Sequence, residues 1–387
     1  MMGSPRVSVL MSVYNGARYL RDAVDSILGQ TFTDFEFIIV DDGSTDETPA
    51  ILNSYTDPRI VRLRNETNIG LTRSLNKGLV VARGEYVARQ DADDVSLPRR
   101  LAKQVEFLDG HPVIGLVGSA YEEFYEDGRL QRAVQMPLQP ADIREQLFYG
   151  HCFCHGSAMA RIRCLHAVGD YDEEYEVAQD RDLWLRLAER FDLANLPEVL
   201  YKLRISVGSV TGRLRPRQRK AACRAVQQAL ERNLLQPSPR TLGRCHWLQA
   251  LDELADGNIT KAQDDLAQAA IENPLLDEDG NWLMQVAVFC AFDITGNGRD
   301  LHLGLAFLSD LHSILPHAGR HLHTKHGWAI AELCAGCAFA AQRRGDRREV
   351  QRNCLRAWQA GWSQRYNMGL LSIFLRSFGM FGQATAR

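Results

Sequence analysis

The chain has 387 residues, with 45 Lys or Arg, 48 Asp or Glu and a formal net charge of −3. Hydrophobic residues make up 45% and charged residues 24% of the sequence. This balance is typical of globular domains, and it argues against a disordered chain or a protein that binds nucleic acid through excess positive charge. The length predicts about two domains.

Composition also bears on the compartment. No run reaches the roughly 18 apolar residues of a membrane span, and the N-terminus lacks the basic and then apolar layout of a signal peptide. The nine cysteines are an odd number and are widely spread, so we expect reduced thiols. The expected location is the cytoplasm.

Short β-branched runs alternate with helical patterns between Val7 and about Tyr201. The predicted strands are Val7–Val13, Phe35–Val40, Ile60–Leu63 and Tyr86–Arg89, with helices over Tyr19–Leu28 and Leu71–Leu79. Such alternation predicts an α/β domain with a mostly parallel sheet. Ligands bind at the carboxyl ends of parallel strands, so polar residues after Val13, Val40 and Gln90 should converge on one crevice.

An acidic turn, Asp41-Asp42-Gly43-Ser44-Thr45-Asp46, follows the second predicted strand. One interpretation is structural: the turn caps the next helix, with Ser44 or Thr45 as the N-cap. The other is functional: a carboxylate fixed at the edge of the sheet accepts the N–H of a nucleobase.

A second acidic segment, Gln90-Asp91-Ala92-Asp93-Asp94, follows the strand that ends at Arg89. Three carboxylates within four residues repel one another unless a cation neutralises them. Oxygen ligands of this kind suit Mg²⁺ or Mn²⁺, which commonly share their coordination with substrate phosphates. A solvated acidic turn before Pro98 is the alternative interpretation.

Six ordered motifs resemble those of the family 2 glycosyltransferases over about residues 6–211. They are Val7–Gly16, Val40–Asp46, Asn68–Leu71, Asn76–Leu79, Gln90–Asp94 and Gln179–Leu187. That family has the GT-A fold and inverts the anomeric centre. The resemblance implies transfer of a sugar from a nucleotide-diphosphate donor, most commonly a UDP-sugar, with Mn²⁺ or Mg²⁺ as cofactor.

The resemblance also implies roles for individual residues. It implies that the base pocket is lined by Ser12, Val13 and Tyr14 and that Asp42 bonds the base. Asp91, followed by Ala92, corresponds to the residue beside the ribose and diphosphate. It assigns the metal to Asp93, with support from Asp94, and the general base to Asp180.

The sequence departs from the family pattern in three places. Gln179 stands where Glu is commoner before the base, and Gly156 follows His155 where relatives have proline. Ser206 replaces a histidine that can reach the diphosphate or the metal. Lys202, Arg204 and the basic run after Thr211 are alternative sources of positive charge. Trp184 either walls the acceptor pocket or belongs to the core.

Beyond Thr211 the composition changes to helix formers, and the basic run Arg213–Lys220 resembles a linker. Turns at Gly257, Gly298 and Gly345 each precede an apolar helical stretch. Ala262, Leu266 and Ala269 occupy the same places after their glycine as Val350, Cys354 and Ala357. We therefore predict two domains, 1–212 and 213–387, the second being α-helical with degenerate, tetratricopeptide-like hairpins.

Two clusters offer zinc as an alternative to core cysteines. One is Cys152 and Cys154 with His151 and His155, and the other is Cys334 and Cys337 with His321, His323 and His326 upstream. Neither has the paired ligand spacing that structural zinc sites usually show, so core positions are favoured.

Two other functions compete with sugar transfer. A sugar nucleotidyltransferase would need a glycine-rich loop after the first strand, where this chain has Tyr14-Asn15-Gly16-Ala17. A nucleotide-sugar-binding or scaffolding protein with a degenerate site is the non-enzyme alternative.

For the enzyme we expect a glycan, lipid-linked or other hydroxyl acceptor. The helical domain would contact the acceptor, a partner or the membrane surface without supplying catalytic residues. Its apolar run Met368–Phe378 is either an amphipathic surface anchor or, as we favour, a helix that caps the last repeat.

Overall fold

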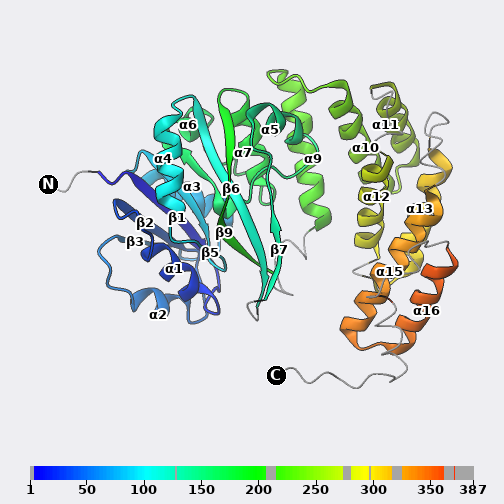
Figure 1. Cartoon of the computed structure of the whole chain (residues 1–387), viewed down its shortest axis with the longest axis horizontal. Helices are drawn as coiled ribbons and strands as arrows, with labels where there is room; N and C mark the ends of the chain where they lie inside the picture. The colour runs from blue at the N-terminus through cyan, green and yellow to red at the C-terminus, as the bar shows by residue number, and fades with distance from the viewer. Residues whose placement is uncertain are drawn as a thin grey trace. The chain divides into compact units, whose positions relative to one another are not determined.

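The computed structural model describes residues 4–126, 129–205, 215–272, 280–295, 298–315, 325–360 and 370. The chain divides into two compact units, Met1–Pro237 and Ser238–Arg387. The first holds a β-sheet with flanking helices and the second is helical (Figure 1). None of the described helices is long and apolar enough to cross a membrane.

A nine-stranded mixed sheet forms the centre of the first unit, in the order β3-β2-β1-β4-β8-β6-β9-β5, with β7 paired to β6. Six strands run in one direction, while β5, β7 and β8 run in the other. The bounds are β1 (Val7–Val13), β2 (Phe35–Asp41), β3 (Ile60–Arg64), β4 (Tyr86–Asp91), β5 (Val95–Ser96), β6 (Ile114–Tyr125), β7 (Leu130–Val134), β8 (Met159–Arg161) and β9 (Asp192–Ile205).

Most helices of the first unit pack apolar faces against this sheet, whereas α9 packs on α7. They are α1 (Leu20–Leu28), α2 (Thr48–Asn53), α3 (Leu71–Val81), α4 (Arg100–Gly110), α5 (Pro140–Gln146), α6 (Ile162–Ala167), α7 (Gln179–Ala188) and α9 (Arg215–Arg232), with a 3₁₀ turn at His155–Ser157. In α1, Leu20, Ala23, Val24 and Ile27 are fully buried, which is the spacing of one helical face. The four predicted strands and both predicted helices are confirmed.

The strand register determines where the polar residues meet. Val13 of β1 lies opposite Asp41 of β2, and Ser12 lies opposite Asp91 of β4. The three parallel strands therefore end at the same level. The residues that follow them reach one edge of the sheet, as expected for ligand sites of α/β folds.

The second unit consists of helices paired with their neighbours in the chain. Its described helices are α10 (Pro239–Ala255), α11 (Ile259–Glu272), α12 (Gly280–Ile294), α13 (Leu301–Ile314), α15 (His326–Arg344) and α16 (Arg347–Gln359). Gly257, Gly298 and Gly345 lie in the turns of the three pairs with φ of 82°, 79° and 78°. Glycine is favoured at such angles. The predicted glycine turns are confirmed, and their interpretation as degenerate repeats stays a prediction.

The matched positions after these glycines belong to the core of the second unit. Ala262, Leu266 and Ala269 are at most 1% exposed, and so are Val350, Cys354 and Ala357. Cys334 and Cys337 are fully buried in α15 among other apolar side chains. These burials agree with the interpretation of the cysteines as core residues. His321, His323, Pro316 and most of the run Met368–Phe378 lie outside the described residues.

The division between the units falls later than the predicted boundary at 212/213. Residues from Arg215 form α9 instead of a linker, and α9 packs on α7 of the first unit. Its Ala225, Val226 and Ala229 are at most 5% exposed. The apolar face that α9 presents to its neighbours explains why it groups with the sheet.

Gly84 offers a test of the packing between β1 and the turn before β4. A Cβ atom there would lie 2.5 Å from Ser8 N and 2.7 Å from Val7 C, both backbone atoms. We expect Gly84→Ala to lower the free energy of unfolding by about 1–3 kcal/mol, since overpacking forces the backbone to shift. Gly110→Ala is the matched control, because a Cβ there meets nothing within 4 Å. Equal urea midpoints for both variants would contradict this packing.

Candidate active site

Asp42 is almost fully buried at the end of β2, and its carboxylate organises the loop before α3. Asn65 Nδ2 and Ile69 N donate to Asp42 Oδ1 at 2.8 and 2.9 Å, and Gly70 N donates to Asp42 Oδ2 at 2.9 Å. A carboxylate has about four acceptor positions. Asp42 therefore uses three of them within the chain and keeps about one for a ligand.

The end of β1 lies beside this carboxylate. Asp42 N donates to Val13 O at 2.8 Å, which joins the two strand ends. Val13 is buried and Tyr14 is 49% exposed, so Tyr14 offers an accessible aromatic ring next to Asp42. The structure thus brings together the residues expected to line the base pocket.

The cap expected at Ser44 or Thr45 is not formed. Helix α2 begins at Thr48, and Asp46 Oδ1 accepts the N–H of Thr48 at 2.9 Å. Ser44 Oγ instead accepts the N–H of Asn15 at 2.9 Å. The turn extends further along the chain than the sequence suggested, to Glu47. Ser44 therefore lies too early to cap α2, and it binds the segment that follows β1 instead.

The loop Asp91–Asp94 is held by strand β9 and by one buried arginine. Arg89, 4% exposed at its side chain, pairs with Asp91 Oδ1 at 2.6 Å. Asp94 Oδ2 accepts the hydroxyl of Tyr201 at 3.0 Å, and Asp94 Oδ1 accepts the N–H of Arg204 at 2.7 Å. Arg204 Nε also donates to the carbonyl oxygen of Asp93 at 2.7 Å.

Asp93 differs from its two neighbours, because its carboxylate forms no hydrogen bond or ion pair with another residue in the described part of the chain. Burial, with repulsion from Asp91, raises the pKa of Asp93 to about 6. A cation beside Asp93 would offset both effects. Asp93 therefore fits a hard divalent ion.

The remaining ligands of such an ion would come from outside the protein. Among the described residues, no group of three or more His, Cys, Asp or Glu is placed to hold a metal. Mg²⁺ and Mn²⁺ suit sites with one or two carboxylates, since water and substrate phosphates complete the coordination. The unpaired carboxylate of Asp93 at this edge of the sheet agrees with that pattern.

The packing around the loop Asp91–Asp94 requires a glycine at position 156. A Cβ atom at Gly156 would lie 2.0 Å from the hydroxyl oxygen of Tyr201 and 2.8 Å from Asp91 Oδ2. Tyr201 is fully buried, and its hydroxyl accepts the N–H of Asp91 at 3.2 Å. The glycine that replaces the proline of the family segment therefore makes room for Tyr201.

His155 lies close enough to both Asp91 and Asp180 for their charges to act on its ring. Its Nε2 is 2.7 Å from the hydroxyl of Tyr171, and its ring meets Trp184 edge-on at 5.9 Å. Burial and, to a smaller extent, the charge of Arg89 lower the pKa of His155 to about 4, against the opposing effects of Asp180 and Asp91. His155 is therefore neutral at pH 7, within electrostatic range of both carboxylates. Trp184 is 4% exposed, in agreement with a core role.

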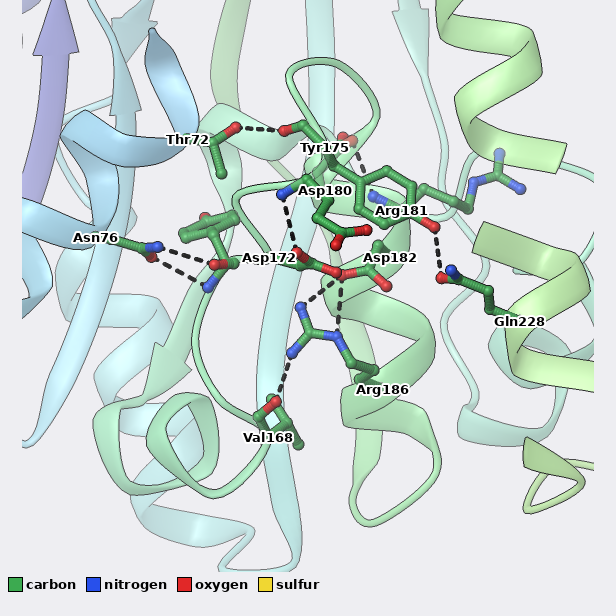
Figure 2. A network of polar contacts seen from close by, with 12 residues as sticks. Thr72, Asn76, Val168, Asp172, Tyr175, Asp180, Arg181, Asp182, Arg186 and Gln228 are labelled. Atoms are coloured by element: carbon green, nitrogen blue, oxygen red, sulfur yellow. Dashed lines mark hydrogen bonds and ion pairs between the residues drawn. The ribbon is translucent and has the colours of Figure 1, made fainter. Parts of the chain in front are cut away.

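Asp180 and Asp182 lie in the first turn of α7 but have different surroundings. Asp182 is 1% exposed and accepts two hydrogen bonds from Arg186, at 2.9 and 2.6 Å. Figure 2 shows Arg186 bridging Asp182 and the carbonyl of Val168. Asp180 is more exposed, and among the described residues its carboxylate accepts only the N–H of the adjacent Arg181, at 2.9 Å to Oδ1. Asp182 is thus committed to structure, and Asp180 remains available.

Two cations considered as replacements for the missing histidine are already engaged. Lys202 Nζ lies 3.2 Å from Glu122, and Arg204 Nη2 lies 2.9 Å from Asp22. The Arg204 guanidinium also lies over the rings of Tyr19 and Phe124. Both cations therefore already have acidic partners, which lie on β6 and α1. Ser206 lies outside the described residues.

Sequence reasoning missed Tyr201 and the structural role of Arg204. The contact between Tyr201 and Asp94 spans 107 positions in the chain. No local pattern could have indicated it, because it depends on β9 lying next to β6 and β5.

Comparisons with known proteins agree with this geometry. The family model described as Glycosyl transferase family 2 matches residues 8–169. The putative glycosyltransferase EpsE of Bacillus subtilis is 40% identical over 211 residues, which are 53% of this chain and 74% of EpsE. The chain belongs to glycosyl transferase family 2. The amylovoran biosynthesis glycosyltransferase AmsE of Erwinia amylovora is 33% identical over 53% of this chain and 79% of its own length.

Solved structures resemble this family 2 chain over most of its length. The mannosyltransferase PcManGT from Pyrobaculum calidifontis, in complex with GDP-Man and Mn²⁺, has a TM-score of 0.48 and 19% identity, and covers 87% of this chain and 88% of its own. TarS of S. aureus, residues 1–349 in complex with UDP-GlcNAc, has a TM-score of 0.47 and 18% identity, covering 88% and 92%. The expected α/β fold with a mostly parallel sheet, followed by a helical region, is confirmed by the order of the elements and the topology of the sheet.

Asp42 carries a stability prediction that follows from its three hydrogen bonds. Asp42→Ala should lower the free energy of unfolding by about 1–3 kcal/mol, because the buried amide of Asn65 and the partly buried N–H groups of Ile69 and Gly70 lose their acceptor. Glu66→Ala, an exposed change in the same loop, is the control and should stay within about 0.5 kcal/mol. Urea unfolding measures both. An Asp42→Ala protein as stable as the control would show that the three hydrogen bonds contribute little.

Proposed function

We propose that this chain is an inverting, divalent-metal-dependent glycosyltransferase that moves a sugar from a nucleoside-diphosphate donor to a hydroxyl acceptor. Membership of family 2 supports the class of reaction. The observation that carries the proposal is the isolation of Asp93. Its neighbours Asp91 and Asp94 are paired within the protein, while Asp93 is held at the sheet edge without a described partner.

The donor would lie across the ends of β1, β2 and β4. We propose that Ser12, Val13 and Tyr14 contact the base and that the remaining acceptor position of Asp42 takes a base N–H. Asp91 and Ala92 would lie beside the ribose and diphosphate. The shared level of the strand ends supports this placement. Uracil, thymine and guanine all offer a ring N–H to such an acceptor. We propose a UDP-sugar as the donor, because it is the commonest donor of the family.

Asp93 would hold Mg²⁺ or Mn²⁺, with Asp94 keeping the loop in place through Tyr201 and Arg204. When bound, the ion supplies positive charge to the diphosphate that leaves the sugar. Asp94 contributes indirectly, since both of its oxygens are used within the protein.

Asp180 would act as the general base. In inversion by direct displacement, the acceptor oxygen forms a bond to the anomeric carbon as the bond from that carbon to the diphosphate oxygen breaks. The acceptor hydroxyl loses its proton to a carboxylate on the opposite face of the sugar. The helix N-terminus at Gln179 favours the ionised carboxylate. The ion pair of Asp182 with Arg186 supports Asp180 as the acceptor of this proton.

The acceptor is proposed at the level of a class. One family member is named for its part in amylovoran biosynthesis, which supports a place in polysaccharide biosynthesis and a glycan or lipid-linked hydroxyl. Contact of the helical unit with the acceptor, a protein partner or the membrane surface remains our proposal for Ser238–Arg387, as does a cytoplasmic location.

Hydrolysis of nucleotide sugars tests the donor and metal assignments without knowledge of the acceptor. A panel of UDP-, GDP- and dTDP-sugars with Mn²⁺ or Mg²⁺ should identify one donor that loses its sugar to water. Asp93→Ala should reduce this hydrolysis by about a hundredfold or more, because the leaving diphosphate loses its stabilising charge. Asp34→Ala, at the opposite end of β2, should leave it unchanged. Hydrolysis that persists in EDTA would overturn the metal, whereas binding without hydrolysis of any sugar would favour a scaffold.

A matched pair of substitutions in α7 tests the base. Asp180→Asn should lower turnover by about 10²- to 10⁴-fold, the usual contribution of a general base, with unchanged affinity for UDP and Mn²⁺. Asp182→Asn should keep far more activity but lose about 1–3 kcal/mol of stability, because Arg186 loses a charged partner. Steady-state kinetics, calorimetry and thermal melting separate the two effects. Full turnover in Asp180→Asn would place the base elsewhere.

A further inference from the structure

The segment Asp170–Ala178, which we call the pre-base loop, links α6 to α7 and ends two residues before Asp180. Asp170 and Ala178 both have a φ of 57°. Residues other than glycine adopt this left-handed conformation at a cost, so surrounding contacts must maintain it. The carbonyl of Ala178 accepts the N–H of Asp182 at 3.3 Å. The conformation of Ala178 therefore sets where α7 begins and where Asp180 lies.

One side of the pre-base loop is fastened to α3. Thr72 Oγ1 donates to the carbonyl of Tyr175 at 2.6 Å. Asn76 Nδ2 donates to the carbonyl of Tyr171 at 2.8 Å, and Asn76 Oδ1 accepts the N–H of Tyr171 at 3.2 Å. Figure 2 shows Thr72 and Asn76 on the same side of the loop. These contacts hold the loop backbone on the donor side of the site.

The other side is fastened to α9 through the side chain of Tyr175. Tyr175 is 1% exposed, and its hydroxyl donates to Gln228 Oε1 at 2.7 Å (Figure 2). The Arg224 guanidinium lies 4.0 Å from the centre of the Tyr175 ring, and it donates to the carbonyl of Glu174 at 3.1 Å. Arg217, earlier in α9, pairs with Glu176. Three positions on α9 therefore contact three consecutive residues of the loop.

Helix α9 is itself fixed on α7, the helix that carries Asp180. Ala225 and Ala229 are fully buried along the face of α9 next to α7. Near the end of α9, Arg232 Nε lies 2.7 Å from Glu189 Oε1, whose side chain is 5% exposed. Contacts thus run from the start of α9 to its last residue. The helix cannot shift without disturbing either the loop or the end of α7.

From these contacts we infer that α9 positions the Asp180 carboxylate by holding Tyr175 of the pre-base loop. Tyr175, Gln228 and Arg224 are positioning residues, since they act through the loop and not on a substrate. The inference rests on the proposed role of Asp180 as the base. It extends the active site to a helix that the sequence placed in the C-terminal domain. A displacement of about 1 Å at a reacting group can cost about a hundredfold in rate, so weak contacts of this kind can have large effects.

The test uses the full chain with Gln228→Leu and Tyr175→Phe, each of which removes the Tyr175–Gln228 hydrogen bond. Gln227→Leu is the matched control, because Gln227 is exposed and its side chain bonds Glu231 of the same helix. Gln228→Glu keeps an acceptor for the Tyr175 hydroxyl and should restore the rate. Hydrogen–deuterium exchange over residues 170–181 reports on the loop. Hydrolysis of the donor found by the panel, and calorimetry with UDP and Mn²⁺, report on the base and on donor binding.

We expect Gln228→Leu and Tyr175→Phe to increase exchange over residues 170–181 and to lower turnover about ten- to a hundredfold, with UDP affinity unchanged. The double variant should lose no more than either single one, because both remove the same bond. Unchanged exchange and turnover in two folded variants would overturn the inference, as would equal losses of turnover and UDP affinity. If the unaltered chain hydrolyses no nucleotide sugar, the proposed function itself fails. Increased exchange in the variants would then show only that α9 holds the pre-base loop in place.

Discussion

Repulsion among Asp91, Asp93 and Asp94 is the constraint on which the arrangement of the first unit depends. Three carboxylates lie within four residues at one sheet edge, where burial removes the water that would screen them. The chain neutralises one with Arg89 and binds another through Tyr201 and the backbone of Arg204. Asp93 alone of the three has no hydrogen-bond or ion-pair partner for its carboxylate among the described residues. In the proposed function, a divalent ion bound together with the donor would complete the balance of charge.

The way in which these carboxylates are bound also determines parts of the fold that lie far from them in the sequence. Strand β9 must run beside β6 and β5, because only there do Tyr201 and Arg204 reach the loop. Gly156 must lack a side chain, because the Tyr201 hydroxyl occupies the space that a Cβ would need. The buried Arg100 lies with its guanidinium 5.3 Å from the centre of the Tyr201 ring and donates to the carbonyl of Arg89. The acidic loop is thus built into the core.

Helix α3 connects the proposed donor end of the site with Asp180, the proposed base. Asp42 accepts the N–H groups of Ile69 and Gly70 at the start of α3, and Thr72 and Asn76 of the same helix hold the pre-base loop. A rigid helix between these two places keeps their spacing constant, which the proposed in-line displacement would require. In the second unit, glycine turns allow the helices of each pair to pack together, and the matched apolar positions are buried.

The sequence by itself determined the strands, the helices that cross between them, the family and the glycine turns of the helical unit. These features depend on neighbours within about ten residues: β-branched runs, helical spacing, and acidic turns at strand ends. Only the tertiary structure decided which carboxylates are committed to the fold. Asp182 and Asp94 look the same in sequence as Asp180 and Asp93, and they differ because Arg186, Tyr201 and Arg204 reach them. The same holds for α9, whose basic start resembles a linker until Tyr175, Arg224 and Gln228 meet. Long-range contacts of this kind depend on how strands and helices pack, and no local pattern encodes them.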